Sequence, residues 1–325
     1  MTSPTFSDSQ VLAQLDSGWH WGNGSISYRF ASNIANLGGT TEVLQFVAPN
    51  ASQQSVLAIA LRGWSDLIRP AFVQTDSANS NIDIAYSGSL GGAYALTYFP
   101  SRGTVWMDST SASLTAPVIG RYGFMAIVHE IGHALGLNHM GSYDGAGAWA
   151  PSSYQDSVVY TLMSYFGPNA FQSSPDVADA DWIGLDGQAY QPQTPMLNDV
   201  MAIQSIYGAS TTTRAGDTVY GFHAAPDPVY DFNSNAHPIL TLYDAGGTDT
   251  LDLSGWASDA EIDLRPGSFS SANGMTRNIA IARNTQIENL AGGGGHDRLT
   301  GNSAANWIDG GDGNDLILSL DGNDR

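Results

Sequence analysis

The first two thirds of the chain alternate between strand-like and helix-like spacings of hydrophobic residues. Alternating apolar and polar positions predict strands at 26–30, 81–86 and 93–98. Apolar residues at three- and four-residue steps predict helices at 52–68 and 197–207. This mixture of elements indicates an α+β domain.

A further helix is predicted directly before Gly136. Its apolar stripe consists of Phe124, Ile127, Val128, Ile131 and Leu135. Gly136 is expected to end this helix, because glycine readily adopts the left-handed conformation that turns the chain. We expect the α+β domain to cover residues 1–208.

Beyond residue 208 the pattern changes to short β-like pieces separated by glycine, aspartate and asparagine. From Gly292 a nine-residue period appears, in which glycine, an acidic or amide residue and an apolar residue each return at a fixed place. The repeated positions are Gly292, Gly301 and Gly310; Asp297, Asn306, Asp315 and Asp324; and Leu299, Ile308 and Ile317. This period is typical of a parallel β-roll loaded with calcium, so we expect an all-β second domain over residues 209–325.

The repeat has a basis in the chemistry of Ca²⁺. Glycines allow tight loops whose carbonyl groups face inward, aspartate adds a charged oxygen, and stacked loops surround an ion with about six oxygen ligands. A flexible Gly/Asp linker is the alternative interpretation, but a linker does not require Leu or Ile at every ninth position. The chain stops at Arg325 inside a fourth copy, so we expect the roll to be truncated at its C-terminus.

Composition narrows the range of functions. The net charge of −20, with no lysine in the chain, disfavours contact with phosphate backbones, so we expect no nucleic-acid partner. No run of about twenty apolar residues occurs, so we expect no membrane span. The absence of cysteine excludes disulfides and thiolate zinc sites. Residues 1–18 lack the basic start and apolar stretch of a cleavable signal peptide.

The strongest chemical signal is His-Glu-Ile-Gly-His-Ala-Leu-Gly-Leu-Asn-His at 129–139. Residues four apart share a helix face, so His129 and His133 can bind one metal ion, and the turn at Gly136 lets His139 return as a third ligand. Glu130 can then reach a water on that ion. The pattern predicts a catalytic zinc site rather than an amphipathic helix with two buried histidines. The other histidines are isolated, and we expect them to be surface or packing residues: His20, His223, His237 and His296.

The expected chemistry is hydrolysis of a peptide bond by a metal-activated water. Three neutral imidazoles leave the zinc its double charge and an open coordination position, which lowers the pKa of bound water from about 15.7 to about 7. Glu130 is expected to take the proton of this water as general base and later to deliver a proton to the leaving amine.

Both halves of the chain together resemble the serralysins, which are secreted bacterial zinc metalloproteases of the metzincin clan. The resemblance rests on the zinc motif, on Leu-Met-Ser-Tyr at 162–165, on Arg-Ala-Gly-Asp-Thr-Val-Tyr-Gly-Phe at 214–222, and on 243–249 and 287–289. It covers nearly everything from about Ile26 to the C-terminus. It implies an α+β metzincin-type zinc protease domain followed by an all-β parallel β-roll (RTX) domain.

The same resemblance assigns roles to further residues. It implies a Met-turn at Met163 that forms an apolar floor beneath the zinc ligands. It also implies that Tyr165 is a fifth zinc ligand, which swings away to donate a hydrogen bond to the tetrahedral intermediate. From the residues alone, a buried structural tyrosine at 165 fits equally well.

Kinship also implies several structural Ca²⁺ ions beside one catalytic Zn²⁺. The implied calcium ligands fall into three groups of loop residues: Arg214, Gly216 and Thr218; Asp244, Gly246, Gly247, Asp249 and Glu288; and Gly293, Gly295, Asp297, Gly310, Gly311, Gly313 and Asp315.

We therefore predict a secreted zinc endopeptidase that acts on protein and peptide substrates. Substrate peptides are expected to add as a strand to an exposed sheet edge, for which 93–98 is the candidate. Kinship implies type I export without an N-terminal signal peptide, to an extracellular or cell-surface location. We expect a monomer, with a proteinaceous inhibitor as a further partner.

Two other functions compete with this prediction. A calcium-dependent surface or adhesion module with a vestigial protease domain is the first, but the complete set of three histidines and Glu130 argues against it. A metzincin of matrixin type is the second, and the Met-Ser-Tyr sequence and the nine-residue repeats favour the serralysins instead.

Overall fold

The computed structural model describes residues 4–22, 24–143, 150–169 and 180–325. The chain forms two compact units: the first comprises 1–156, 161–165 and 198–210, and the second comprises 157–160, 166–197 and 211–325. In the described part of the chain, no helix has both the length and the apolar character needed to cross a lipid bilayer.

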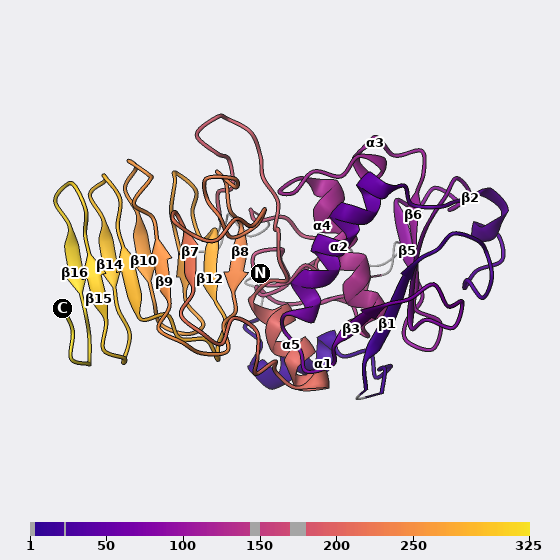
Figure 1. The fold of residues 1–325 in the computed structure, drawn as a ribbon, viewed down its shortest axis with the longest axis horizontal. Helices are drawn as coiled ribbons and strands as arrows, with labels where there is room; N and C mark the ends of the chain where they lie inside the picture. The colour runs from indigo at the N-terminus through magenta and orange to yellow at the C-terminus, as the bar shows by residue number, and fades with distance from the viewer. Residues whose placement is uncertain (1–3, 23, 144–149, 170–179) are drawn as a thin grey trace. The chain divides into compact units, whose positions relative to one another are not determined.

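The first unit is built on a mostly parallel sheet (Figure 1). Its strands are β1 (Ile26–Phe30), β2 (Phe46–Val47), β3 (Phe72–Gln74), β4 (Ile82–Ser87), β5 (Ala95–Thr97) and β6 (Thr104–Asp108). They follow the order β3-β1-β4-β6-β5, and β2 pairs with β4. Strand β5 is antiparallel to β6 and ends this order, so the predicted edge at 93–98 does lie at an edge of the sheet.

Among the described residues, five α-helices and one 3₁₀-helix accompany this sheet. They are α1 (Asp8–Leu15), η1 (Glu42–Gln45), α2 (Ala51–Ser65), α3 (Ala112–Thr115), α4 (Tyr122–Ala134) and α5 (Leu197–Tyr207). Helices α2 and α4 pack side by side (Figure 1), and the Trp64 indole of α2 donates a hydrogen bond to the Val128 carbonyl of α4 at 2.9 Å. The helix predicted at 52–68 is therefore present, but it ends at Ser65.

The apolar stripe predicted for α4 is fully buried, since each of its five residues is at most 1% exposed. The helix ends at a glycine that no other residue could replace without strain. Gly136 has φ +101°, and a Cβ at this position would lie 2.2 Å from the Trp19 carbonyl oxygen. The Leu137 amide returns to the Gly132 carbonyl at 2.9 Å and closes the turn.

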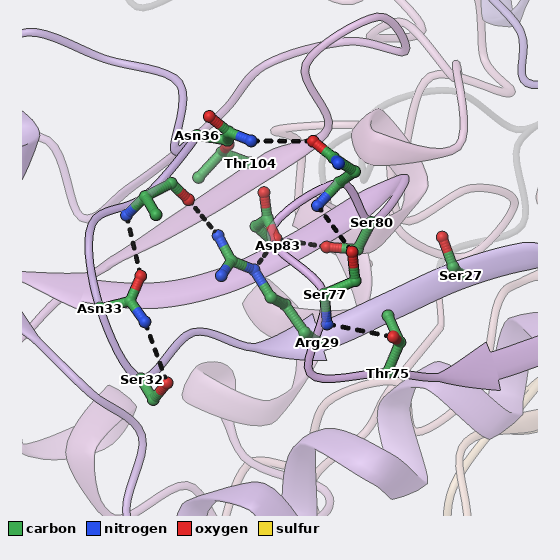
Figure 2. Close-up of polar contacts among 12 residues, drawn as sticks. Ser27, Arg29, Ser32, Asn33, Asn36, Thr75, Ser77, Ser80, Asp83 and Thr104 are labelled. Atoms are coloured by element: carbon green, nitrogen blue, oxygen red, sulfur yellow. Dashed lines mark hydrogen bonds and ion pairs between the residues drawn. The ribbon is translucent and has the colours of Figure 1, made fainter.

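One face of this sheet carries a buried polar row beside an apolar one. Arg29, Asp83 and Thr104 are in register across β1, β4 and β6. Arg29 donates to the Asp83 carboxylate, as Figure 2 shows. It also donates to the Ala35 carbonyl. Burial raises the pKa of Asp83, and the hydrogen bond from Arg29 opposes that rise. A buried ion pair adds little net stability, but this one fixes the loop that follows β1. The neighbouring apolar row consists of Ala31, Ala85 and Trp106.

The second unit is a stack of short, mostly parallel strands (Figure 1). They are β7 (Val219–Gly221), β8 (Leu240–Leu242), β9 (Thr250–Asp252), β10 (Glu261–Asp263), β11 (Phe269–Ser270), β12 (Ile279–Ile281), β13 (Asn289–Ala291), β14 (Arg298–Thr300), β15 (Trp307–Asp309) and β16 (Leu316–Leu318). Three sheets result, with the orders β15-β13-β9-β7, β10-β14-β16 and β11-β12-β8. Only the β11–β12 pair is antiparallel among the described strands of this unit.

The nine-residue period corresponds to half a coil of this roll. Leu290 pairs with Ile308 and Leu299 pairs with Ile317, so paired positions are two periods apart. Consecutive repeats therefore alternate between two sheets. The apolar residue of each repeat faces the interior: Leu290 and Leu299 are fully buried and Ile308 is 8% exposed, whereas Ile317 on the last strand is 42% exposed.

Candidate metal centre

Helix α4 and the turn after it bring three histidines to one point. His129 and His133 lie one helical turn apart, and the chain reverses at Gly136 so that His139 faces them. The ligand nitrogens of the three side chains lie within 4.8 Å of one another. Among the described His, Cys, Asp and Glu side chains, no other group of three converges as closely.

Each imidazole is oriented by a backbone carbonyl. The Nδ1 atoms of His129, His133 and His139 lie 2.6, 2.7 and 2.9 Å from carbonyl oxygens of residues 162, 137 and 143. A carbonyl only accepts, so each Nδ1 carries the proton and each Nε2 presents a bare lone pair. Burial lowers the pKa of His129 to about 4 and that of His133 well below its usual range. The rings of His129 and His133 are therefore neutral at pH 7 and suited to bind a metal ion.

The arrangement of the nitrogens fits Zn²⁺. The Nε2 atoms of His133 and His139 are 3.0 Å apart. Two bare lone pairs at this distance repel each other unless a cation lies between them. Three imidazole nitrogens without a fourth His, Cys, Asp or Glu ligand in the described chain match a catalytic zinc site, which keeps one coordination position open.

Glu130 lies beside the first ligand and is held by the sheet. Its Oε2 accepts a hydrogen bond of 2.6 Å from the Thr97 hydroxyl of β5. Burial raises the pKa of Glu130 to about 7, and the hydrogen bond from Thr97 opposes the rise. A carboxylate that titrates near neutral pH is matched to the work of a general base.

Met163 lies against α4. Its side chain is fully buried, and a Cβ on Gly132 of α4 would approach its sulfur to 2.9 Å. The glycine therefore makes room for the methionine at the floor of the site.

Asp199 of α5 anchors the turn that carries Met163, and the sequence analysis missed it. Its carboxylate accepts hydrogen bonds from the Leu162 amide at 2.7 Å and from the Thr161 hydroxyl. The carbonyl of Leu162 in turn orients His129. A signal was present, because Asp199 stands four residues before Ile203, on the apolar face of the predicted helix.

Tyr165 lies over the open side of the histidine cluster. Its ring centroid is 4.5 Å from that of His139 and 6.1 Å from that of His129. The side chain is 42% exposed, which excludes the alternative of a buried structural tyrosine.

A second buried carboxylate that the sequence did not reveal supports this side of the site. Asp156 is fully buried and accepts hydrogen bonds from the hydroxyls of Tyr143 and Ser164. The Tyr143 carbonyl faces Nδ1 of His139, and Ser164 precedes Tyr165. Asp156 thus ties the loop of the third histidine to the Met-turn.

The first two groups of predicted calcium ligands come together in the second unit. Oδ1 of Asp249 accepts a hydrogen bond from the Thr218 amide, and the Asp249 amide donates to Glu288, each at 2.8 Å. Oδ2 of Asp249 is buried and has no hydrogen-bond partner among the described residues. Burial, with the nearby charges of Asp244 and Glu288, raises the pKa of Asp249 to about 7. A buried carboxylate oxygen without a partner, close to other carboxylates, fits a hard cation such as Ca²⁺.

Arg214 and three glycines complete these two groups. The Arg214 guanidinium donates to the Tyr243 carbonyl at 2.7 Å, and the Arg214 carbonyl accepts from the Thr218 hydroxyl at 3.5 Å. The Gly216 carbonyl accepts from the Thr218 hydroxyl at 2.9 Å. Gly246 and Gly247 have φ of +138° and +144° in the loop between Asp244 and Asp249.

The third group forms stacked loops in the repeats. A Cβ on Gly311 would lie 2.1 Å from the Gly293 carbonyl oxygen, and one on Gly313 would lie 1.9 Å from that of Gly295. Loops that lie two periods apart in the sequence therefore stack as closely as their backbones allow. The aspartates link neighbouring copies, because the Asp297 amide donates to Asp315 at 3.0 Å. Gly310 packs against the same Asp315 carboxylate, which a Cβ would approach to 2.3 Å.

Two protein-family models match this chain. The family model described as "Metallo-peptidase family M12B Reprolysin-like" matches residues 60–186, and the one described as "Peptidase M10 serralysin C terminal" matches residues 209–324. The predicted fold class, an α+β zinc-protease domain followed by a parallel β-roll, is thereby confirmed.

Curated relatives carry the same family name. A serralysin of Photorhabdus laumondii subsp. laumondii is 36% identical over 284 residues, which are 82% of this chain and 56% of the relative. Metallopeptidase AprA of Pseudomonas marginalis is 37% identical over 311 residues, 88% of this chain and 62% of the relative. Serralysin C of Dickeya chrysanthemi is 36% identical over 296 residues, 85% of this chain and 58% of the relative.

The chain thus spans little more than half the length of these relatives. Its matches nevertheless run through both the metal-binding helix and the β-roll, in the same order along the sequence. The chain belongs to the serralysin family of metallopeptidases.

Proposed function

We propose that this protein is a secreted zinc-dependent endopeptidase that hydrolyses peptide bonds in proteins. The observation that carries the proposal is the convergence of three imidazole nitrogens within 4.8 Å, with Glu130 next to the first of the three histidines. Membership of the serralysin family supports the reaction class.

The protein contributes a fixed set of ligands to this reaction. His129, His133 and His139 would hold one zinc ion through Nε2, because their Nδ1 atoms are engaged by carbonyls. When bound, the zinc supplies a Lewis acid that polarises the scissile carbonyl and makes a water easier to deprotonate.

Glu130 is the group that moves the proton. Its Oε2 is tied to Thr97, while Oε1 has no hydrogen-bond partner among the described residues. Oε1 can therefore accept the proton of the attacking water and pass it to the nitrogen of the leaving amine. Tyr165 lies beside His139 and is exposed, so its hydroxyl can donate to the oxygen on which negative charge develops.

Strand β5 is the place where we expect the substrate to bind. It pairs with β6 on one side and ends the order of the sheet. An extended peptide can add to such an edge through main-chain hydrogen bonds. Binding of this kind depends on the peptide backbone, so we expect cleavage of many sequences.

The β-roll would bind structural calcium through the three groups of loop residues described above. Asp249 and Glu288 supply carboxylates, and the glycine loops supply carbonyl oxygens. A roll that needs Ca²⁺ to balance its carboxylates would fold best where the ion is abundant. This requirement agrees with an extracellular location.

Cleavage of casein tests the proposed function. Protein loaded with zinc and calcium should cleave casein, and Glu130→Ala should retain one zinc per chain while losing at least about 10²-fold in rate. Removal of zinc with a chelator should stop cleavage in the wild type. Zinc-loaded wild type that cleaves neither casein nor a peptide library would contradict the proposal and favour a calcium-dependent binding module.

A further inference from the structure

We propose that Thr97 is a positioning residue for Glu130, so that the strand expected to hold the substrate also sets the general base. The inference rests on the proposed function and adds a residue to it. It is carried by the contact between the Thr97 hydroxyl and Glu130 Oε2, which joins β5 to α4 at 2.6 Å.

The register of β5 explains why Thr97 faces the site. Leu96 pairs with Trp106 and packs with the apolar cluster on one face of the sheet. Successive side chains of a strand point to opposite faces, so Thr97 points to the other face, where α4 packs against β5. Glu130 on α4 lies within reach of its hydroxyl.

The hydroxyl is itself a rigid anchor. Threonine is branched at Cβ and has few accessible rotamers, and the backbone of Thr97 is fixed by its pairing with Val105 of β6. Glu130, in contrast, has a long side chain with many accessible rotamers, whose immobilisation costs conformational entropy. A fixed donor on one oxygen therefore restricts the carboxylate before the substrate arrives.

As a result, one carboxylate oxygen of Glu130 is hydrogen-bonded within the described part of the protein and the other is not. Thr97 is the only hydrogen-bond partner of this carboxylate within the described ranges, and it engages Oε2 alone. Oε1 stays available for the water proton. This division is the pre-organisation that proton transfer requires, because a misdirected carboxylate would have to rotate before it could act.

Three variants test the proposal. Thr97→Val keeps the shape of the side chain and removes the donor, Thr97→Ser keeps the donor, and Thr75→Val is the matched control. The Thr75 hydroxyl bonds only to the Ser77 amide, at 3.1 Å, in the part of the chain that the structure describes. Zinc content, melting temperature, kcat and KM should be measured for each with one peptide substrate.

We expect Thr97→Val to lower kcat about tenfold, the effect of one hydrogen bond to a charged group. Its KM, zinc content and melting temperature should match those of the wild type. Thr97→Ser should restore most of kcat, and Thr75→Val should change nothing. A crystal structure of zinc-loaded Thr97→Val should show Glu130 in more than one rotamer, whereas the wild type should show one.

The outcomes separate this inference from the proposed function. Wild type without peptidase activity would contradict the function itself. If the wild type cleaves peptides and Thr97→Val keeps its kcat, the function stands and the positioning role of Thr97 is wrong. A loss of zinc or of melting temperature in both Thr97→Val and Thr97→Ser would show that Thr97 only supports the fold, which also overturns the inference.

Discussion

The histidine cluster and the loops that carry Asp244, Asp249 and Glu288, called the calcium loops below because we propose that they bind Ca²⁺, differ in one respect. They differ in whether the protein itself supplies partners for their buried polar atoms. In the cluster the Nδ1 atom of each imidazole has a backbone carbonyl partner. In the calcium loops Asp249 lies close to the charges of Asp244 and Glu288, and its Oδ2 is buried without a partner.

This difference indicates which unit depends on its ion for folding. Removing zinc leaves three imidazoles that stay hydrogen-bonded to backbone carbonyls through Nδ1, and no carboxylates of the described residues are left facing one another there. Removing calcium leaves clustered carboxylates that repel one another in a partly buried place. We therefore expect zinc to serve activity and calcium to serve the fold of the second unit.

Selective removal of calcium or of zinc should change folding and activity more than any substitution proposed below. A calcium chelator should abolish the cooperative unfolding transition of the second unit, measured by circular dichroism and limited proteolysis, because binding and folding are coupled. A zinc chelator should stop peptide cleavage and leave both transitions in place. A roll that keeps its transition without calcium would remove the contrast between the two regions.

Asp199 tests whether the histidine cluster is fixed by the protein. Asp199→Asn replaces a carboxylate that accepts from Leu162 and Thr161 with an amide that cannot accept both bonds. Loss of the orientation of His129 should weaken zinc binding about 10- to 100-fold. Zinc titration should show this change, while Asp76→Asn at an exposed position of the same unit should bind as the wild type does.

Features of the fold and of the site could be predicted from the sequence where the residues that make them lie close together along the chain. The convergence of the three histidines, the turn at Gly136 after α4 and the nine-residue period of the roll all follow from residues close together in the sequence. Asp199, Asp156 and Thr97 could not be assigned in this way, because their partners are set by the packing of distant segments. Asp199, for example, contacts Leu162 across 37 positions of sequence.

Substitution of Asp249 should change the stability of the second unit in opposite directions with and without calcium. Asp249→Asn removes one charge from the carboxylates of the loop, so the calcium-free second unit should gain stability. With calcium present the same change removes a charged ligand and should raise the calcium concentration needed for folding about tenfold. Thermal unfolding across a calcium titration measures the stability in the absence and in the presence of calcium. Destabilisation in both conditions would contradict a calcium role for Asp249.

The pH dependence of the calcium-free protein should give the smallest effect. Burial and neighbouring charges raise the folded-state pKa of Asp249 to about 7, above its unfolded value. The contribution of Asp249 to the free energy of unfolding is therefore fully present below the pKa that this carboxyl has in the unfolded chain. It is lost as the pH rises through about 7. Without calcium, the melting temperature of the second unit should fall between pH 5 and pH 8. With saturating calcium, that fall should be smaller or reversed.

The location of zinc is the most direct test of the account. Anomalous diffraction at the zinc absorption edge, on crystals grown with zinc and calcium, would place the ion without assumptions about activity. We expect one zinc at about 2.0–2.1 Å from Nε2 of His129, His133 and His139. A zinc ion bound elsewhere, or three histidines with no zinc between them, would contradict the account.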